Sequence, residues 1–364
     1  MIEGNRVELL HDGVACLPAM LDAIRGAKRE ILLEMYWFGS DATGRRFAAA
    51  LSDKAREGVR VCITYDAVGS WEADRGMFEG LRVAGCSVLE FNPLHKWRLR
   101  WRIGNRRNHR KQLVVDGQLG MTGGVNLADP WAPESEGGLG FRDDLIVIEG
   151  PAVAEMRAIF FATFEGRKAA QAARRQPLPA AVGDTRVVVL ANDARRNRRL
   201  IERAYLRAIS VARRRVWIEN SYFIPSWLVR HALNRAVKRG VDVRVVLPSK
   251  SDVPAVAYAT RRLYAVLLRH GIRLFEWAQS VLHSKIAVVD DWCTVGTHNL
   301  DYRSWIYNLE LNVVVDDARV SELVGARIQQ AISSSVEVDA QAWKFRPLLE
   351  RLLEHLFYRF RRLL

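Results

Sequence analysis

Two short segments of the chain place a histidine, a lysine and an aspartate at the same spacing. Both follow the pattern His-x-Lys-x4-Asp, and they lie 174 residues apart. The residues are His109, Lys111 and Asp116 in the first segment, and His283, Lys285 and Asp290 in the second. Imidazole titrates near neutral pH, so one ring can be a neutral nucleophile or base while another is a protonated acid. With a lysine cation beside each ring, the pattern predicts catalysis on an anionic substrate.

Each segment reads as a β-strand that carries its histidine and lysine on one side. Residues i and i+2 of a strand face the same way, so His109 projects with Lys111, and His283 with Lys285. Apolar, strand-forming residues follow, and each aspartate falls at the strand end, where it can stabilise a turn. A metal site is disfavoured, because lysine is a poor ligand at neutral pH and no further ligand recurs nearby.

The surrounding sequence repeats as well. Each segment runs into a glycine-containing turn that ends in asparagine, Asn126 or Asn299, and Glu34 in an apolar stretch corresponds to Glu219. Strands are expected at 7–10, 30–38, 59–65 and 87–91, and again at 186–191, 215–223, 241–247 and 272–277, with helical stretches between them. This alternation predicts an α/β fold of two α/β/α units related by a pseudo-twofold axis.

The repeat also sets the expected domain boundaries. The first unit spans 1–170 and the second 186–338, joined by a linker over 171–185 that is rich in Ala, Arg, Gln and Pro. A helical hairpin is the alternative for the linker. The last stretch, 339–364, has apolar residues at helical spacing and a largely basic remainder, which predicts an amphipathic basic helix.

Composition limits the classes of partner. The 364 residues include 49% hydrophobic and 26% charged residues, as in a globular protein, and no apolar run is long enough to span a membrane. The first thirty residues lack a secretory pattern, and four isolated cysteines suggest a reducing compartment. The formal net charge is +14, carried mostly by arginine, which predicts a polyanionic partner: nucleic acid or an anionic membrane.

The paired motifs resemble those of the phospholipase D superfamily, and the wider pattern is similar to bacterial cardiolipin synthases, especially the B-type enzymes without transmembrane helices. The similarity extends from about residue 5 to 335 and includes 31–38, 58–70, 108–126, 141–153, 219–225, 282–299 and 308–310. The resemblance implies that the two phospholipase D-like repeats form one active site at their interface.

The resemblance also implies a mechanism and roles for individual residues. One histidine attacks phosphorus to give a phosphohistidine, and the other protonates the leaving alkoxide. Comparison with other superfamily members favours His109 as the nucleophile and His283 as the acid and base. The two lysines would neutralise phosphoryl oxygens, while Asn126 and Asn299 donate hydrogen bonds to them. No cofactor or metal is required.

Superfamily members also orient each catalytic imidazole with an acidic residue further along the chain. Glu310 and Asp143 are the two candidates, with Asp144 as the alternative to Asp143.

Several other residues are candidates for the site. Glu34 and Glu219 either accept hydrogen bonds near it or are purely structural, and Asp66 and Ser70 are candidates for lining the cleft. A basic, tryptophan-bearing insertion before the first motif suits a lipid headgroup interface, with a half-buried strand or hairpin as the alternative. Its contact residues would be Trp97, Arg98, Arg100, Trp101 and Arg102.

The favoured function is a cardiolipin synthase-like phosphatidyltransferase that converts two molecules of phosphatidylglycerol into cardiolipin and glycerol. A phospholipase D-type hydrolase and a metal-independent nuclease are the alternatives, and a non-catalytic phosphate-binding protein is disfavoured by the two complete motifs. The expected partner is an anionic membrane that contains phosphatidylglycerol and cardiolipin, rather than nucleic acid. The expected location is the cytoplasmic side of the bacterial inner membrane, bound peripherally. The C-terminal helix would lie on the membrane or dock on the protein body.

Overall fold

The computed structural model describes residues 1–93, 105–193 and 199–362. The first half contains strands β1 (Ile2–His11), β2 (Glu30–Met35), β3 (Arg60–Asp66), β4 (Ser87–Phe91), β5 (Gln112–Val115), β6 (Leu119–Gly123) and β7 (Asp144–Glu149). Its helices are α1 (Asp12–Gly26), α2 (Ala42–Arg56), α3 (Arg75–Val83), α5 (Val153–Phe164) and α6 (Arg167–Arg174), with short 3-10 turns η1 (Asp129–Trp131) and η2 (Glu134–Glu136).

The second half repeats this order. Its strands are β8 (Thr185–Asn192), β9 (Arg215–Asn220), β10 (Asp242–Pro248), β11 (Arg273–Trp277), β12 (Lys285–Val289), β13 (Trp292–Gly296), β14 (Glu310–Asp316) and β15 (Val336–Glu337). The helices are α7 (Leu200–Val211), α8 (Trp227–Lys238), α9 (Pro254–Arg269), α10 (Tyr302–Ile306), α11 (Ala318–Ser333) and α12 (Leu348–Arg359), and the 3-10 turn η3 (Ala342–Phe345) precedes α12.

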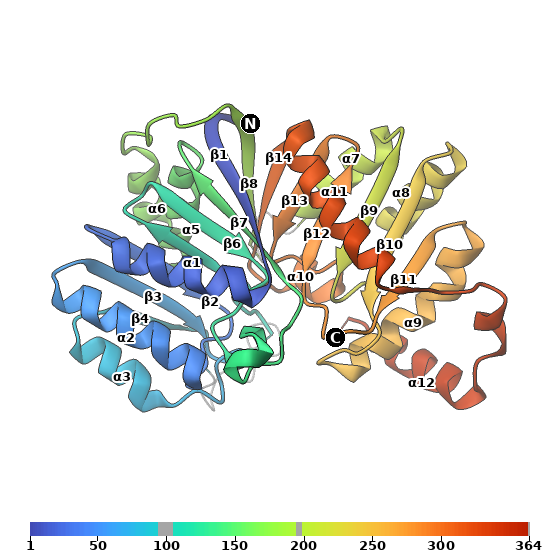
Figure 1. The fold of residues 1–364 in the computed structure, drawn as a ribbon, viewed down its shortest axis with the longest axis horizontal. Coiled ribbons are helices and arrows are strands. Elements are labelled where there is room, and N and C mark those ends of the chain that lie inside the picture. Colours follow the sequence, from blue (N-terminus) through green and yellow to red (C-terminus); the bar gives the residue numbers. More distant parts are fainter. Residues whose placement is uncertain (94–104, 194–198, 363–364) are drawn as a thin grey trace.

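The fifteen strands of the described residues form one open sheet whose order shows the repeat. From the central strand β1 outward it runs β7-β6-β5-β2-β3-β4, and from β8 outward it runs β14-β13-β12-β9-β10-β11-β15. Strands β1 and β8 pair antiparallel in the middle (Figure 1). Corresponding strands therefore occupy corresponding places in the two halves. The predicted α/β fold of two repeated units is confirmed.

Helices cover both faces of the sheet. Helices α1 to α3 pack on one face of the first half and α7 to α9 on the corresponding face of the second, each group with its own core. Helices α5 and α11 cover the other face, where a shared core continues from Ile146 and Val114 of the first half to Ile286 and Leu311 of the second. Because this core is continuous, the halves are fixed to each other by apolar burial.

The glycine landmarks of the repeat have a conformational cause. Gly58 and Gly240 follow α2 and α8 with φ of 87° and 85°, a left-handed conformation that ends a helix without steric cost for glycine. The next residues enter the parallel strands β3 and β10, which pair with β2 and β9. The parallel pairing therefore places the carboxyl ends of β2 and β3 side by side, and those of β9 and β10 likewise.

Two regions, the linker between the halves and the C-terminal stretch, differ in detail from the sequence prediction. Helix α6 packs against α5, so the predicted linker 171–185 begins inside a helix, and 175–184 contain no helix or strand. In the predicted C-terminal helix 339–364, the helix proper is α12, preceded by η3. Among the described residues, no helix is both long enough and apolar enough to cross a membrane.

Candidate active site

The two motif histidines lie where the halves meet. His109 precedes β5 and His283 precedes β12, at the edge of the sheet where β2 and β9 end. The backbone N–H of His109 donates to the carbonyl of Leu309 (3.0 Å), and that of His283 donates to the carbonyl of Arg142 (2.8 Å). Both bonds cross between the halves, so each histidine is held by the backbone of the other repeat. This pairing also explains why the strands begin after the histidines, at Gln112 and Lys285, and not at the histidines themselves.

Each histidine is also paired with a carboxylate from the opposite half. Nδ1 of His109 lies 3.0 Å from Oε2 of Glu310, and Nδ1 of His283 lies 2.8 Å from Oδ2 of Asp143. All four side chains are buried. With Nδ1 engaged, Nε2 is the ring nitrogen left for chemistry in both histidines.

The two carboxylates stay charged although they are buried. Burial alone would raise the pKa of Glu310, but His109 and a hydrogen bond from Thr297 hold this pKa at about 2. The pKa of Asp143 is also lowered, because its interaction with His283 outweighs burial, and the indole of Trp131 donates to Oδ2 (2.8 Å). An ionised carboxylate accepts the Nδ1–H hydrogen, which fixes the tautomer of each imidazole.

Burial favours the neutral form of both imidazoles. Burial, together with the neighbouring cations Lys111 and Lys285, lowers the pKa of His109 to about 4, although Glu310 opposes the shift. The pKa of His283 is lowered by burial and by Lys285, with Asp143 acting in the opposite direction. A bound phosphodiester anion would raise both values by its negative charge.

The two motif lysines are buried next to the histidines. Nζ of Lys111 donates to the carbonyl oxygen of His109 (2.9 Å), and Nζ of Lys285 contacts both the carbonyl oxygen and Nδ1 of His283. Burial lowers the pKa of Lys111 to about 7 and that of Lys285 to about 8, with the charge of Lys285 contributing to the shift at Lys111. The positive charge of these two lysines is not fully balanced by nearby carboxylates, so the site favours an anionic ligand.

Two aromatic rings that sequence reasoning missed pack against the histidines. Tyr36 meets His109 edge to face with ring centroids 4.9 Å apart, and Trp131 meets His283 in the same way at 5.0 Å. Nζ of Lys111 also lies 5.0 Å from the Tyr36 ring centroid. Tyr36 directly follows the strand that carries Glu34, but nothing in the sequence relates Trp131, on η1, to the second motif.

The motif asparagines are fixed through their side-chain oxygens. Oδ1 of Asn126 accepts from the backbone N–H of Trp37 (3.1 Å), and Oδ1 of Asn299 accepts from the hydroxyl of Ser221 (2.9 Å). Trp37 and Ser221 lie in the turns that follow β2 and β9. The oxygen of each amide is therefore engaged, which leaves its NH₂ group as the donor to a ligand.

The structure does not bring the two motif aspartates, Asp116 and Asp290, together with the histidines. They lie at the opposite ends of β5 and β12, both with positive φ, 54° and 50°. Asp116 accepts backbone N–H groups of Lys28, Arg29 and Glu30. Asp290 accepts the corresponding groups of 213–215. Their grouping with the catalytic residues is corrected. By accepting these backbone N–H groups, they hold the starts of the neighbouring strands β2 and β9 in place.

Asp66, Ser70 and Glu34 support the backbone around His109. Asp66 accepts from the backbone N–H of Asn108 (2.7 Å), and Glu34 accepts from the side-chain amide of Asn108 (2.7 Å). Ser70 accepts from the backbone N–H of Phe38 (3.0 Å). All are buried, so Asp66 and Ser70 brace the loops and do not line an open cleft.

Two further buried carboxylates, one from each half, make contacts between the repeats. Glu219 accepts two hydrogen bonds from Arg142, at 2.8 and 3.3 Å, next to Asp143. Asp144, the alternative partner for His283, instead contacts Nδ1 of His11 (2.7 Å), Arg327 (3.0 Å) and the hydroxyl of Ser284. Glu219 and Asp144 therefore position the residues adjoining the His283–Asp143 pair.

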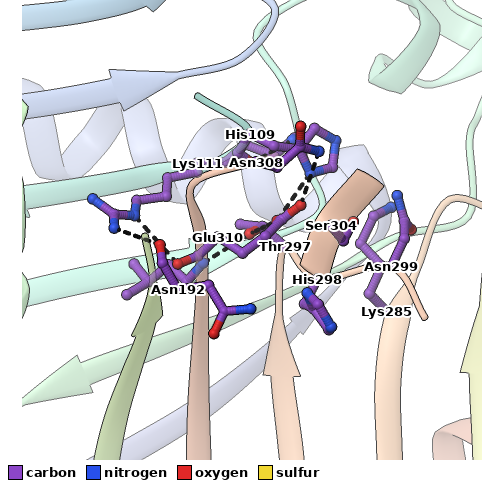
Figure 2. A network of polar contacts seen from close by, with 12 residues as sticks. His109, Lys111, Asn192, Lys285, Thr297, His298, Asn299, Ser304, Asn308 and Glu310 are labelled. Carbon is purple, nitrogen blue, oxygen red and sulfur yellow. Dashed lines mark hydrogen bonds and ion pairs between the residues drawn. The ribbon is translucent and has the colours of Figure 1, made fainter. Parts of the chain in front are cut away.

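A third buried histidine lies near Glu310. His298 is fully buried between Thr297 and Asn299, and within the described chain neither of its ring nitrogens has a hydrogen-bond partner (Figure 2). Burial lowers its pKa to about 4. Glu310 also accepts from Thr297 (2.5 Å) and from the Asn308 amide (3.2 Å). Sequence reasoning missed these residues, although Thr297 and His298 lie inside the glycine-containing turn that ends at Asn299.

Two further sequence expectations remain predictions. The expected headgroup contacts Trp97, Arg98, Arg100, Trp101 and Arg102 lie outside the described residues. Among the described residues, no group of three or more His, Cys, Asp or Glu side chains is arranged to hold a metal ion. That the reaction needs no metal ion stays a prediction, and activity after dialysis against EDTA checks it.

Comparison with solved structures identifies the fold. Phosphatidylserine synthase from Haemophilus influenzae superimposes with a TM-score of 0.74 at 15% identity, covering 98% of this chain and 93% of that one. Polyphosphate kinase from Porphyromonas gingivalis gives a TM-score of 0.60 at 15% identity, over 97% of this chain and 56% of the other. At these identities the likeness concerns the fold alone.

The sequence matches place the chain in a class. The family model described as "Cardiolipin synthase, PLD-like domain" matches residues 20–160 and 205–332, one match in each repeat. The fold and the paired motifs thus define a phospholipase D-like enzyme. Cardiolipin synthase B from Escherichia coli is 31% identical over 350 residues, 92% of this chain and 82% of that protein. A cardiolipin synthase from Geobacillus thermodenitrificans is 34% identical over 314 residues, 85% of this chain and 62% of that protein.

The chain belongs to the cardiolipin synthase family of the phospholipase D superfamily. It is accordingly an enzyme of the phosphatidyltransferase type.

Proposed function

We propose that the protein transfers the phosphatidyl group of one phosphatidylglycerol molecule to a hydroxyl of a second, forming cardiolipin and releasing glycerol. The observation that carries this proposal is the pair of histidine–carboxylate contacts, His109 with Glu310 and His283 with Asp143, each joining the two halves. Family membership supports the choice of a phospholipid substrate.

The reaction proceeds in two displacements at phosphorus. Nε2 of the neutral nucleophilic histidine attacks the phosphodiester, the P–N bond forms, and the P–O bond to glycerol breaks. The second histidine gives its Nε2 proton to the departing glycerol oxygen. It then removes the proton of the incoming phosphatidylglycerol hydroxyl, whose oxygen attacks phosphorus and releases the first histidine. A placed acid–base group contributes about 10²–10⁴-fold to such steps.

We assign His109 as the nucleophile and His283 as the acid and base. The pKa of His109 is lowered to about 4, so this ring is neutral at physiological pH, as a nucleophile must be. Glu310 then stabilises the positive charge that the ring acquires when it bonds to phosphorus. His283, paired with Asp143, acquires its proton when the substrate anion raises its pKa.

Charge on the phosphoryl oxygens is balanced by groups of both repeats. Lys111 and Lys285 supply positive charge from the two halves, and their lowered pKa values would rise again beside an anion. Asn126 and Asn299 donate from their amide nitrogens. Because these donors are preorganised in a buried site, they stabilise the transition state more than they would in water.

The membrane supplies both substrates, so we propose that the protein binds peripherally to the cytoplasmic side of the bacterial inner membrane. The net charge of +14 supports binding to anionic phosphatidylglycerol and cardiolipin.

The test is mass spectrometry of lipids after the purified protein acts on phosphatidylglycerol vesicles, with plasmid DNA incubated in parallel. Cardiolipin and glycerol are expected, and both should disappear in His109→Ala and in His283→Ala, with the plasmid intact. Phosphatidic acid as the product would instead indicate hydrolysis of the phospholipase D type. Nicked plasmid without lipid product would indicate a nuclease.

A further inference from the structure

The outer face of α12 exposes a continuous set of large apolar side chains. Four of the five leucines of α12 are between 50% and 68% exposed, and Phe345 before the helix is 86% exposed. We call this set the leucine face; it consists of Phe345, Leu348, Leu349, Leu352, Leu356 and Phe360. The leucine spacing follows the helical repeat, so the four exposed leucines share one side of α12. Single exposed apolar residues are ordinary, but a contiguous patch marks an interaction surface.

The opposite face of α12 is docked on α9, as Figure 1 shows. Phe357 stacks on Tyr258 with centroids 5.6 Å apart, and the Trp343 ring lies 4.8 Å from that of Tyr264. Arg346 makes two hydrogen bonds to the buried carboxylate of Glu354, at 2.9 and 2.7 Å. A helix of this length is marginal alone. Docking therefore holds it in place while the leucine face points outward.

The charges around the leucine face have one sign. Lys344, Arg351, Arg359 and Arg362 are exposed between 341 and 362, a segment that the structure describes throughout. The two carboxylates of that segment are withdrawn from solvent: Glu350 is half-buried, and Glu354 is buried against Arg346. An apolar face flanked by exposed basic residues complements an anionic lipid surface.

The C-terminal end of α12 reaches the edge of the sheet that carries the active site. Tyr258, its stacking partner, lies one turn into α9, which starts after β10 at that edge. The Arg361 guanidinium lies 5.8 Å from the ring centroid of Tyr302, the first residue of α10, shortly after Asn299. The chain directly after α12 thus lies close to the start of α10, three residues after Asn299.

Further exposed apolar side chains follow the same edge. Trp227 and Leu228 open α8 after β9, Val253 precedes α9 after β10, and Trp71 lies in the loop after β3. The two tryptophans are 63% and 72% exposed. Tryptophan is favoured at the level of lipid headgroups. This edge therefore presents apolar side chains from both repeats beside the histidines.

We propose that the leucine face inserts into the interface of an anionic bilayer and brings the catalytic edge against the lipid headgroups. The proposal deepens the proposed function, on which it rests for the choice of a lipid as the partner. It also joins the two sequence-based alternatives for this helix: one face docks on the protein body, and the other contacts the membrane. A lipid would then need to expose only its headgroup to reach the histidines.

The first test is vesicle sedimentation with the double variant Leu349→Glu/Leu352→Glu. Two carboxylates in the leucine face should weaken binding to phosphatidylglycerol vesicles at least about tenfold, because both apolar contact and charge attraction are reduced. The matched control is Val83→Glu, which adds a carboxylate at an 82% exposed position at the end of α3, at the opposite edge. It should bind as the wild type does. Unchanged binding of the double variant would overturn the proposal.

Activity separates membrane docking from a structural role of the helix. Turnover of a soluble phosphodiester, bis(4-nitrophenyl) phosphate, should be unchanged in the double variant, while turnover of phosphatidylglycerol vesicles falls with binding. Equal loss on both substrates, with a lower unfolding temperature, would show that the leucines serve folding and would contradict the proposal.

A second measurement does not depend on destabilising substitutions. The four native cysteines are buried, so a nitroxide can be placed selectively at Leu352→Cys, or at Val83→Cys as a control. On phosphatidylglycerol vesicles the label at position 352 should gain accessibility to oxygen, which concentrates in the bilayer, and the label at position 83 should not. An unchanged label at position 352 would overturn the proposal.

The remaining outcomes identify other partners or a failure of the proposed reaction. If the double variant changed the mass of the protein in lipid-free sedimentation while vesicle binding stayed constant, a second copy would occupy the face and the proposal would be wrong. Wild-type protein that binds vesicles through this face but makes no cardiolipin would refute the proposed function and leave the docking surface supported.

Discussion

Glu310, in the second half of the chain, lies 3.0 Å from the ring of His109 in the first half. Asp143 and His283 form the reciprocal pair at 2.8 Å. Neither repeat therefore contains a complete histidine–carboxylate unit. The duplicated chain builds each unit from both halves, and the continuous core under α5 and α11 fixes their relative position.

Removing the charge of Glu310 tests this relationship. Glu310→Gln should lower kcat by about 10²–10⁴-fold with little change in KM, because the carboxylate acts on the charge of the imidazole and not on substrate binding. The pKa of His109, which Glu310 raises, should fall further, moving the acidic limb of the pH profile to lower pH. Steady-state kinetics on phosphatidylglycerol vesicles measures both effects.

The matched control is Glu155→Gln, which removes a surface carboxylate paired with Arg174. It should leave kcat and the pH profile unchanged. If Glu310→Gln behaved like this control, the pair would have no role in catalysis.

The motif aspartates should matter for stability and not for chemistry. Asp116→Ala removes an acceptor of three backbone N–H groups at a left-handed position. The free energy of unfolding should fall by about 1–3 kcal/mol. The kcat of the folded fraction should stay at the wild-type value. Denaturant unfolding and kinetics at a temperature where the variant is folded would check this, and a large fall in kcat without loss of stability would contradict it.

His298 should make the fold sensitive to acid. Its pKa is about 4 in the folded protein, below the value of about 6.5 for an exposed histidine. Between these values the unfolded chain binds the proton more readily, so stability is complete above about pH 6.5 and declines as the pH falls toward about 4. His298→Val installs the residue type of Val125, its counterpart in the first repeat.

Between about pH 8 and about pH 5, the free energy of unfolding of this variant should therefore fall by about 2 kcal/mol less than that of the wild type. Guanidinium unfolding at the two pH values gives the difference. The same acid sensitivity in both proteins would show that His298 is not the titrating group.

Chelators should leave turnover unchanged. Lys111 and Lys285 bring two cations to the site from the two halves. They supply the charge neutralisation that a divalent ion could otherwise provide. Activity after dialysis against EDTA, with and without added Mg²⁺ or Ca²⁺, tests this. A strict requirement for a divalent ion would contradict the proposed route.

Much of the fold follows from local patterns. The glycines after α2 and α8, the buried strand of Glu34 and the repeated motif all predict corresponding elements in two halves, and the sheet contains them in corresponding places. The direct pairing of β1 with β8 is not encoded in any short pattern. It depends on which apolar faces meet when both halves pack.

The site was predictable to the extent that its residues lie in the repeated motifs. Trp131 lies outside the two His-x-Lys-x4-Asp motifs, so comparing these motifs could not reveal its hydrogen bond to Asp143. Grouping Asp116 and Asp290 with the catalytic residues is wrong for the opposite reason. They belong to the motif, yet a strand separates them from the histidines, and their spacing serves the backbone of the neighbouring strand.

The most direct test of the central claim is to trap the covalent intermediate on one histidine. Rapid acid-free quenching and peptide mass spectrometry after mixing with phosphatidylglycerol vesicles should find a phosphatidyl adduct on His109. The adduct should accumulate in a slow acid–base variant, His283→Gln, and be absent in His109→Gln. An adduct on neither histidine, or full turnover by the double variant His109→Gln/His283→Gln, would contradict the account.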